Sequence, residues 1–127
     1  MGSGQSRRRT SRPRAVPIDG DAFALAQDRV LPIRYDGDAQ RIVESASNLT
    51  RLKMIRALSE TPLAASDLAR IVSRTAPATS QHIKVLRDIN AIAPTRQGNI
   101  VRYHLTNEPS AHILVAIARA FDALREH

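Results

Sequence analysis

The stretch "TSQHIKVLRDINAI", residues 79–92, shows the 3.6-residue period of an amphipathic helix. On a helical wheel, Ile83, Leu86 and Ile89 fall close together, and this apolar stripe predicts a buried side. The other side holds small hydrogen-bonding residues followed by charged ones, namely Ser80, Gln81, Lys84 and Asp88. That side lacks the Glu/Lys mixture of an ordinary solvated face. Two interpretations stay open, a surface offered to a partner and a plain solvent-exposed face, and the neighbouring segments decide between them.

A shorter helix is predicted just before this one. The segment "TPLAASDLARIV", residues 61–72, reads as a turn followed by a helix that carries Leu68 and Ile71. Thr75 is then placed to cap the next helix, and Pro77 is tolerated in its first turn. Two short helices separated by a few residues form the helix-turn-helix pattern, whose second helix enters the major groove of DNA.

A β-hairpin is predicted directly after the second helix. In "AIAPTRQGNIVRYHL", residues 91–105, apolar and polar residues alternate on either side of Gly98, which supplies the turn. One side of the second strand holds Val101, Tyr103 and Leu105, and the other holds Ile100, Arg102 and His104. A basic hairpin that follows a helix-turn-helix is a wing.

Further helices are predicted on the N-terminal side of this motif. A short one begins at about Asp21, with Asp19 or Asp21 as its cap, and ends before Pro32. Residues 37–47 form the next, with Ile42, Val43 and Ala46 on one side. Asn48 is a good cap for residues 49–60. The apolar stripe of that helix is made of Leu49, Leu52, Ile55 and Leu58.

The C-terminal segment "PSAHILVAIARAFDALREH" predicts a last helix, started by Pro109. Its apolar stripe consists of Ile113, Leu114, Ile117, Phe121 and Leu124. That stripe is too wide for a small domain to cover alone, so part of it is expected to meet another chain. The elements together predict a mainly α fold with a small β-hairpin, in the α+β class.

Charge and length suggest a single DNA-binding domain. The chain of 127 residues carries a net charge of +7, and all its basic residues but Lys53 and Lys84 are arginines. The planar arginine fork suits phosphate and base edges. We expect residues 1–18 to be a disordered arm and residues 19–127 to be one domain. The arm holds Arg7, Arg8, Arg9, Arg12 and Arg14, which could lie in a minor groove or act only as a solubilising or targeting tail.

Other classes of function lack the residues they need. The only aromatic residues are Phe23, Tyr35, Tyr103 and Phe121, and they are not spaced as base-stacking platforms, which favours duplex DNA over single strands. The absence of cysteine excludes thiolate metal sites and thiol redox chemistry. We find no catalytic constellation and no apolar run of membrane-spanning length, so we expect no enzyme, no membrane partner and a cytoplasmic, nucleoid-associated location.

From Asn48 to Leu105 the chain resembles the ArsR/SmtB family of winged-helix repressors. The family's Asp-Pro-Thr-Arg, Glu-Leu-Ala and Ser-x-His-Leu-Lys-Val-Leu elements correspond here to "NLTRLKMIRALSE", "SDLARIV" and "SQHIKVLRD", followed by the wing. The MarR-like family shares this architecture. The resemblance implies a homodimer, paired through its first and last helices, that reads an inverted repeat. It assigns Ile42, Val43, Ile113, Leu114, Ile117, Phe121 and Leu124 to the dimer interface.

The chain departs from the family at its metal sites. The cysteines of the family's Leu-Cys-Val-Cys-Asp-Leu motif are replaced by Ala64 and Ser66, and neither side chain holds a thiophilic metal. A second family site uses Asp, His, His and Glu of the final helices. This chain offers His112, Asp122, Glu126 and His127 there, but not at the family's spacing. We therefore expect no metal and no other cofactor.

The candidate DNA contacts lie on three segments. On the recognition helix they are Thr75, Thr79, Ser80, Gln81 and Lys84; on the wing they are Arg96, Gln97, Asn99 and Arg102; and Arg74 and the arm arginines complete the set. Gln81 suits adenine, and Lys84 suits phosphate. His82 borders the apolar stripe, which makes it a packing residue more readily than a base reader.

The sequence favours a dimeric repressor that binds an operator in duplex DNA. Two alternatives remain. The basic arm also suits an architectural or accessory protein of a phage, plasmid or chromosome, which would bind without regulating one gene. A winged helix can also serve as a protein-interaction module, with Ser80 and Gln81 merely exposed.

Overall fold

The structure, a computed structural model, describes residues 16–126, and the chain divides after Ile33 into two compact units. The first contains helix α1 (Gly20–Gln27), none of whose residues is buried. The Asp19 carboxylate accepts a hydrogen bond of 3.0 Å from the Ala22 amide, which confirms Asp19 as the N-cap. Among the described residues, no helix has the length and apolar character that crossing a membrane requires.

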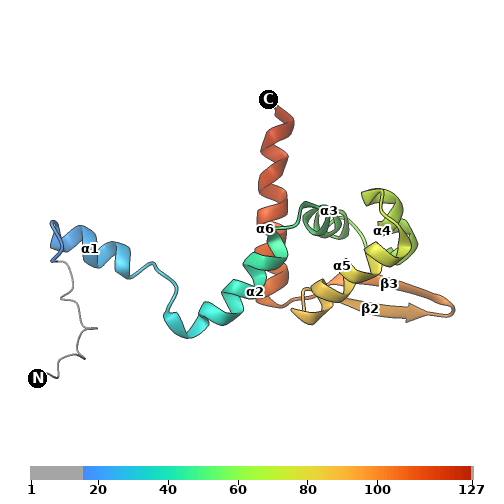
Figure 1. Cartoon of the computed structure of the whole chain (residues 1–127), viewed down its shortest axis with the longest axis horizontal. Coiled ribbons are helices and arrows are strands. Elements are labelled where there is room, and N and C mark those ends of the chain that lie inside the picture. The colour runs from blue at the N-terminus through green and yellow to red at the C-terminus, as the bar shows by residue number, and fades with distance from the viewer. Residues whose placement is uncertain (1–15, 127) are drawn as a thin grey trace, which may run out of the picture. The chain divides into compact units, whose positions relative to one another are not determined.

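The second unit, from Arg34 onward, holds most of the helices and the whole sheet (Figure 1). A short 3₁₀ turn, η2 (Ile33–Tyr35), leads into it. Its elements are α2 (Asp36–Ala46), α3 (Leu49–Leu58), β1 (Leu63–Ala64), α4 (Ala65–Val72), α5 (Ala76–Asp88), β2 (Ile92–Gln97), β3 (Ile100–Leu105), α6 (Pro109–Ala120) and the 3₁₀ segment η3 (Phe121–Glu126). This order confirms the predicted helix-turn-helix in α4 and α5 and the wing in β2 and β3.

Capping side chains set the helix starts that the sequence predicted. Asn48 Oδ1 accepts a hydrogen bond of 3.1 Å from the Arg51 amide, and Thr75 Oγ1 accepts one of 3.2 Å from the Ala78 amide. Helix α5 ends at Asp88 and so covers only the first part of the stretch 79–92. Asn90 takes a left-handed conformation with φ of 61°, which turns the chain into β2.

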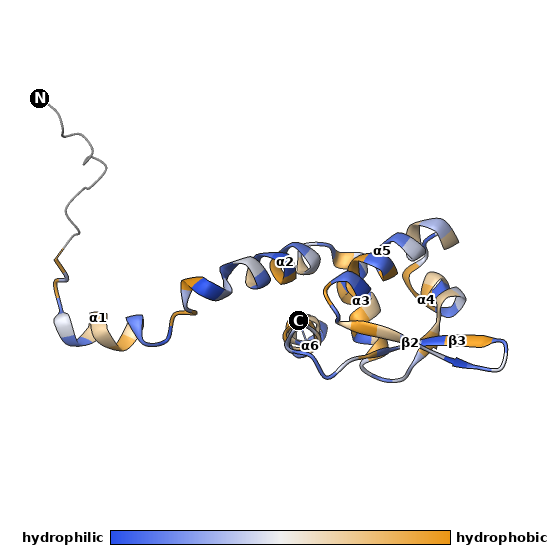
Figure 2. Ribbon diagram, turned by 90° about the horizontal axis from the view of Figure 1, so that it is seen from below, coloured by the Kyte–Doolittle hydropathy of each residue, from blue (hydrophilic) through white to orange (hydrophobic). Residues whose placement is uncertain are grey.

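The sheet has three antiparallel strands in the order β1-β3-β2. Gly98 opens the two-residue turn with φ of +61°, so the sequence located the wing turn correctly. Strand β1 was not predicted, since the sequence indicated only a turn there. Its two residues are a strand because Leu63 pairs with Tyr103 and Ala64 with Arg102. Along β2 the residues change from hydrophobic at the core to hydrophilic toward the turn (Figure 2).

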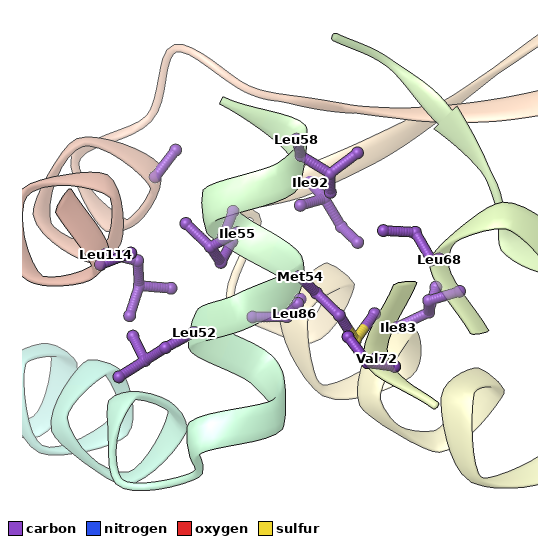
Figure 3. Close-up of a cluster of buried hydrophobic side chains, with 13 residues drawn as sticks. Leu52, Met54, Ile55, Leu58, Leu68, Val72, Ile83, Leu86, Ile92 and Leu114 are labelled. Atoms are coloured by element: carbon purple, nitrogen blue, oxygen red, sulfur yellow. The ribbon is translucent and has the colours of Figure 1, made fainter. Parts of the chain in front are cut away.

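Helix α3 lies at the centre of the hydrophobic core (Figure 3). Met54 and Ile55 of α3 are fully buried, together with Leu68 of α4, Leu86 of α5 and Leu114 of α6. Because helices pack on more than one side of α3, its buried arc is wide and includes Met54, which lies outside the predicted stripe.

Two residues of the predicted stripes are exposed. Leu49 is 59% exposed because it lies opposite the arc that Ile55 and Leu58 bury. Ile71 is 53% exposed, and Val72, the next residue of α4, is buried instead. In both helices the apolar residues outnumber the positions that face the core.

Candidate nucleic-acid interface

Helix α5 buries one side and exposes the other, as the wheel of residues 79–92 predicts. Ile83 and Leu86 are buried with exposed fractions of 4% and 0%. Ser80, Gln81 and Lys84 are exposed. The exposed side therefore carries a hydroxyl, an amide and an ammonium group, which are hydrogen-bonding groups suited to base edges and phosphates.

Thr79 does not belong to this exposed side. It is only 1% exposed, and its hydroxyl donates a hydrogen bond of 2.8 Å to the carbonyl oxygen of Thr75. The sequence left Thr79 open between a contact in the DNA groove and a packing role, and this burial favours packing. Its wheel position lies next to those of Ile83 and Leu86, so the periodicity already contained the signal.

The N-terminus of α5 is open to solvent. Arg74 and Thr75 are both exposed, and the Arg74 guanidinium donates only a long hydrogen bond, of 3.3 Å, to the Ser73 carbonyl oxygen. The partial positive charge of a helix N-terminus favours an anion at this end.

Lys84 already has an anionic neighbour. Its Nζ lies 3.0 Å from Asp88 Oδ2, four residues on, and both side chains are more than half exposed. Sequence reasoning missed this pair, although a lysine and an aspartate at that spacing share one side of a helix. Such an exposed pair contributes little stability, so a phosphate can replace the carboxylate at small cost.

The wing carries its polar residues on both faces. Arg96, Gln97, Asn99 and Arg102 are all exposed. Because Arg96 pairs with Val101 and Thr95 with Arg102, the two arginines lie on opposite faces of the hairpin. The Arg96 guanidinium reaches the Gly98 carbonyl oxygen at 3.5 Å, and the Arg102 guanidinium reaches Gln97 Oε1 at 3.5 Å. These long contacts leave both side chains available to a polyanion.

Arg51 connects the recognition helix to α2, a role that sequence reasoning missed. Its guanidinium donates to the carbonyl oxygens of Ser45 and Glu44, at 3.0 and 3.2 Å, and lies 3.4 Å from His82 Nδ1. Partial burial and the positive charges of Arg51 and Arg74 lower the pKa of His82. His82 is half-buried, and its lowered pKa favours the neutral form of the imidazole. Both properties agree with the packing role expected for it.

Two of the residues considered for a metal, Asp122 and His112, have other partners, and His127 lies outside the described residues. Asp122 accepts hydrogen bonds from Arg56, with a shortest distance of 2.9 Å, and this guanidinium holds the pKa of the Asp122 carboxyl below its usual range. His112 Nε2 lies 3.0 Å from Asn107 Oδ1. Within residues 16–126, no three His, Cys, Asp or Glu side chains gather as metal ligands would.

Most of the predicted interface residues are exposed. Val43, Ile113, Phe121 and Leu124 have exposed fractions of 58, 43, 48 and 67%. Ile42 and Ile117 are half-buried against the core. Leu114 is 1% exposed and belongs to the core of its own subunit, which contradicts its assignment to an interface. The arm arginines Arg7, Arg8, Arg9, Arg12 and Arg14 lie outside the described residues.

Sequence comparison identifies relatives of the segment that contains α3, α4 and α5. Residues 48–91 match the family described as "Bacterial regulatory protein, arsR family". The cadmium resistance transcriptional regulatory protein CadC homolog of Staphylococcus aureus is 28% identical over 90 residues, which cover 70% of this chain and 72% of the homolog. The HTH-type transcriptional regulator KmtR of Mycobacterium tuberculosis is 28% identical over 69 residues, 54% of this chain and about half (53%) of KmtR.

Solved structures share the fold. The transcriptional repressor BigR of Xylella fastidiosa superposes with a TM-score of 0.65 at 22% identity, covering 72% of this chain and 90% of BigR. The antimony-specific transcriptional repressor AntR gives 0.63 at 23% identity, over 89% of this chain and all (100%) of AntR. A homodimeric winged helix-turn-helix DNA-binding domain from Mycobacterium bovis gives 0.60 at 18% identity, over 88% of this chain and 96% of that domain.

Proposed function

The chain is a winged helix-turn-helix protein of the ArsR type, and from this premise we propose that it is a dimeric repressor of transcription. It binds an inverted-repeat operator in duplex DNA, within the cytoplasm at the nucleoid. The observation that carries the proposal is the division of α5 into a buried side and an exposed side. Ile83 and Leu86 hold the helix on the core, and Ser80 and Gln81 are free to meet base edges.

The wing supports the same function. Arg96 and Arg102 lie on a hairpin that follows α5 directly, and both are exposed. When α5 lies in the major groove, a basic hairpin beside it reaches the backbone or the neighbouring minor groove. Arg74 and Thr75, at the N-terminus of α5, would contact phosphate.

A dimer explains the apolar residues that the subunit leaves exposed. Val43 of α2 and Ile113 of α6 are both exposed, and so are Phe121 and Leu124 of η3. The similar domain from Mycobacterium bovis is described as homodimeric. A twofold axis would place one α5 helix in each subunit. The two half-sites of the operator would then lie about 10 base pairs apart or a multiple of that distance.

We propose that no thiolate-bound metal controls the binding of this chain to DNA. The CadC homolog is named for cadmium resistance, but this chain has no cysteine at all and has Ala64 and Ser66 at the family's thiolate positions. Asp122, which the C-terminal segment offers without the spacing of the second family site, is held by Arg56. We therefore propose a regulator without a cysteine-based metal or redox sensor.

Selection of genomic fragments by the purified protein tests this function. We expect the bound fragments to share one palindromic motif and the affinity to fall steeply with salt, because phosphate contacts release counterions. A gel-shift titration in which no genomic fragment is preferred over random DNA would contradict the proposal. Broad, cooperative footprints without a palindrome would instead favour an accessory protein of the chromosome.

A further inference from the structure

A hollow lies between α5 and the sheet, beside the side of α5 that we propose reads bases. Its volume is about 460 Å³. The lining includes Ser80, Ile83, Lys84, Arg87 and Asp88 of α5 and Tyr103 of β3. We name it the α5–β3 hollow. Sequence reasoning assigned no role to Arg87 or Tyr103.

Arg87 is the cation of this hollow that has no fixed partner. Its side chain is exposed, and among residues 16–126 it makes no ion pair and no side-chain hydrogen bond. Tyr103, by contrast, packs against the hydrophobic core. The wall opposite α5 is therefore fixed, and the guanidinium fork is free to meet an anion with two parallel hydrogen bonds.

The hollow lies where one strand of a bound DNA duplex would pass. A helix in the major groove and a hairpin in the next minor groove are separated by one sugar–phosphate strand, which has to cross between them. The hollow lies between α5 and β3, where that crossing would occur. The register places Arg96 on the same hairpin face as Tyr103, so a further arginine belongs to this side of the wing.

Asp88 is the one acid of the lining, and its position is electrostatically unfavourable. It is the last residue of α5, where the negative end of the helix dipole disfavours a carboxylate. The lysine also precedes the acid by four residues, which is the weaker order for such a pair. Asp88 nevertheless holds Lys84 at 3.0 Å and so places a negative charge where a phosphate would be attracted.

We propose that the α5–β3 hollow binds one phosphate of the DNA strand, with Arg87 as its principal ligand and Asp88 as a competing anion. In the free protein the Asp88 carboxylate forms an ion pair with the Lys84 ammonium group. On DNA the phosphate takes its place, and the retained acid weakens binding to every sequence alike. This inference rests on the proposed function, because it requires that α5 and the wing contact the same duplex.

The test needs no knowledge of the operator, because a phosphate contact is independent of sequence. Binding of the full chain to a fluorescent mixed-sequence duplex of about 30 base pairs, long enough for two half-sites, is followed by anisotropy over a salt series. Arg87→Gln should weaken binding about fivefold and lower the salt slope by about one. Asp88→Asn should tighten binding by a similar factor, a gain that a folding defect cannot produce.

Lys53→Gln is the matched control, since it removes one charge from the exposed side of α3, away from the hollow. Equal effects of Arg87→Gln and Lys53→Gln, or an Asp88→Asn variant that binds no tighter, would overturn the inference while the proposed function stands. A wild-type chain that binds neither this duplex nor any genomic fragment would mean that the proposed function itself fails.

Free phosphate is distinguished from the DNA strand by repeating the titration in potassium phosphate and in potassium chloride at equal ionic strength. We expect the two salts to weaken wild-type binding equally. If potassium phosphate weakened DNA binding by the wild type more than potassium chloride did, and Arg87→Gln abolished this difference, the hollow would bind a free anion. That result would overturn its assignment to the DNA strand.

Discussion

Gln81 stands on the exposed side of α5, and its amide can donate to and accept from one adenine. We expect Gln81→Ala to cost about 1–3 kcal/mol of operator binding and to relax the preference at one base pair. Selection of bound duplexes from a randomised library measures both effects. Equal losses on operator and scrambled DNA would contradict the assignment of Gln81 to a base edge.

Arg102 provides the comparison, because it lies on the wing and we assign it to the backbone. Arg102→Ala should weaken all sequences alike and lower the salt slope by about one. A shift in base preference on removal of Arg102 would show that the wing reads sequence and would revise its role.

His82 makes the stability of the fold depend on pH. Burial and the charges of Arg51 and Arg74 lower its pKa in the folded chain below the ordinary 6.5, so the unfolded chain binds the proton more tightly. His82 therefore does not lower the free energy of unfolding above pH 6.5, and this free energy decreases as the pH falls below that value. Urea unfolding at about pH 7.5 and 5.5 measures the difference.

The matched variant is His82→Gln, which keeps an acceptor for Arg51 and removes the titration. Its stability should change less over this interval than that of the wild type. The same pH dependence in both proteins would show that His82 is not the responsible group.

The elements could be predicted from the sequence wherever a local signal fixes them. The caps Asn48 and Thr75 and the turn at Gly98 were found because each acts on neighbouring residues, and Asp19 was found as one of two possible caps. Strand β1 was missed because its two residues form a strand only through pairing with β3, some forty positions along the chain.

The exposed side of α5 was also predicted, because the helical period separates Gln81 from Ile83. The contacts between side chains of different helices were less predictable. The contacts of Arg51 with α2 and His82 depend on how three helices pack, and no spacing in the sequence shows them. Leu114 was misassigned for a similar reason: an apolar stripe does not tell which part its own subunit covers.

Helix α3 lies at the centre of the core, so the stability of the fold should depend on the Asn48 cap that begins this helix. Asn48→Ala removes the acceptor for the Arg51 amide and should lower the free energy of unfolding by about 1 kcal/mol. Asn48→Asp keeps an acceptor at the same place and should lose much less. Urea unfolding of the three proteins decides this, and an alanine variant as stable as the wild type would show that the cap contributes nothing.

Within the second unit, the C-terminal segment exposes an apolar surface that a second copy would cover in the proposed dimer. Phe121 and Ile113 belong to adjoining parts of the C-terminal segment, and each exposes more than two fifths of its surface. Paired half-sites require a stable dimer, so DNA binding and self-association should depend on the same residues.

Phe121→Glu should therefore raise the dimer dissociation constant about a hundredfold or more, because a charge would be buried without a partner. Sedimentation equilibrium measures the association, and the operator affinity should fall with it. Ile71→Glu is the matched control: Ile71 is similarly exposed, at 53% against 48% for Phe121, but lies on α4. It should remain dimeric. If Phe121→Glu stayed dimeric, or Ile71→Glu dissociated equally, the C-terminal segment would not be the interface, and the spacing of the two α5 helices would need another origin.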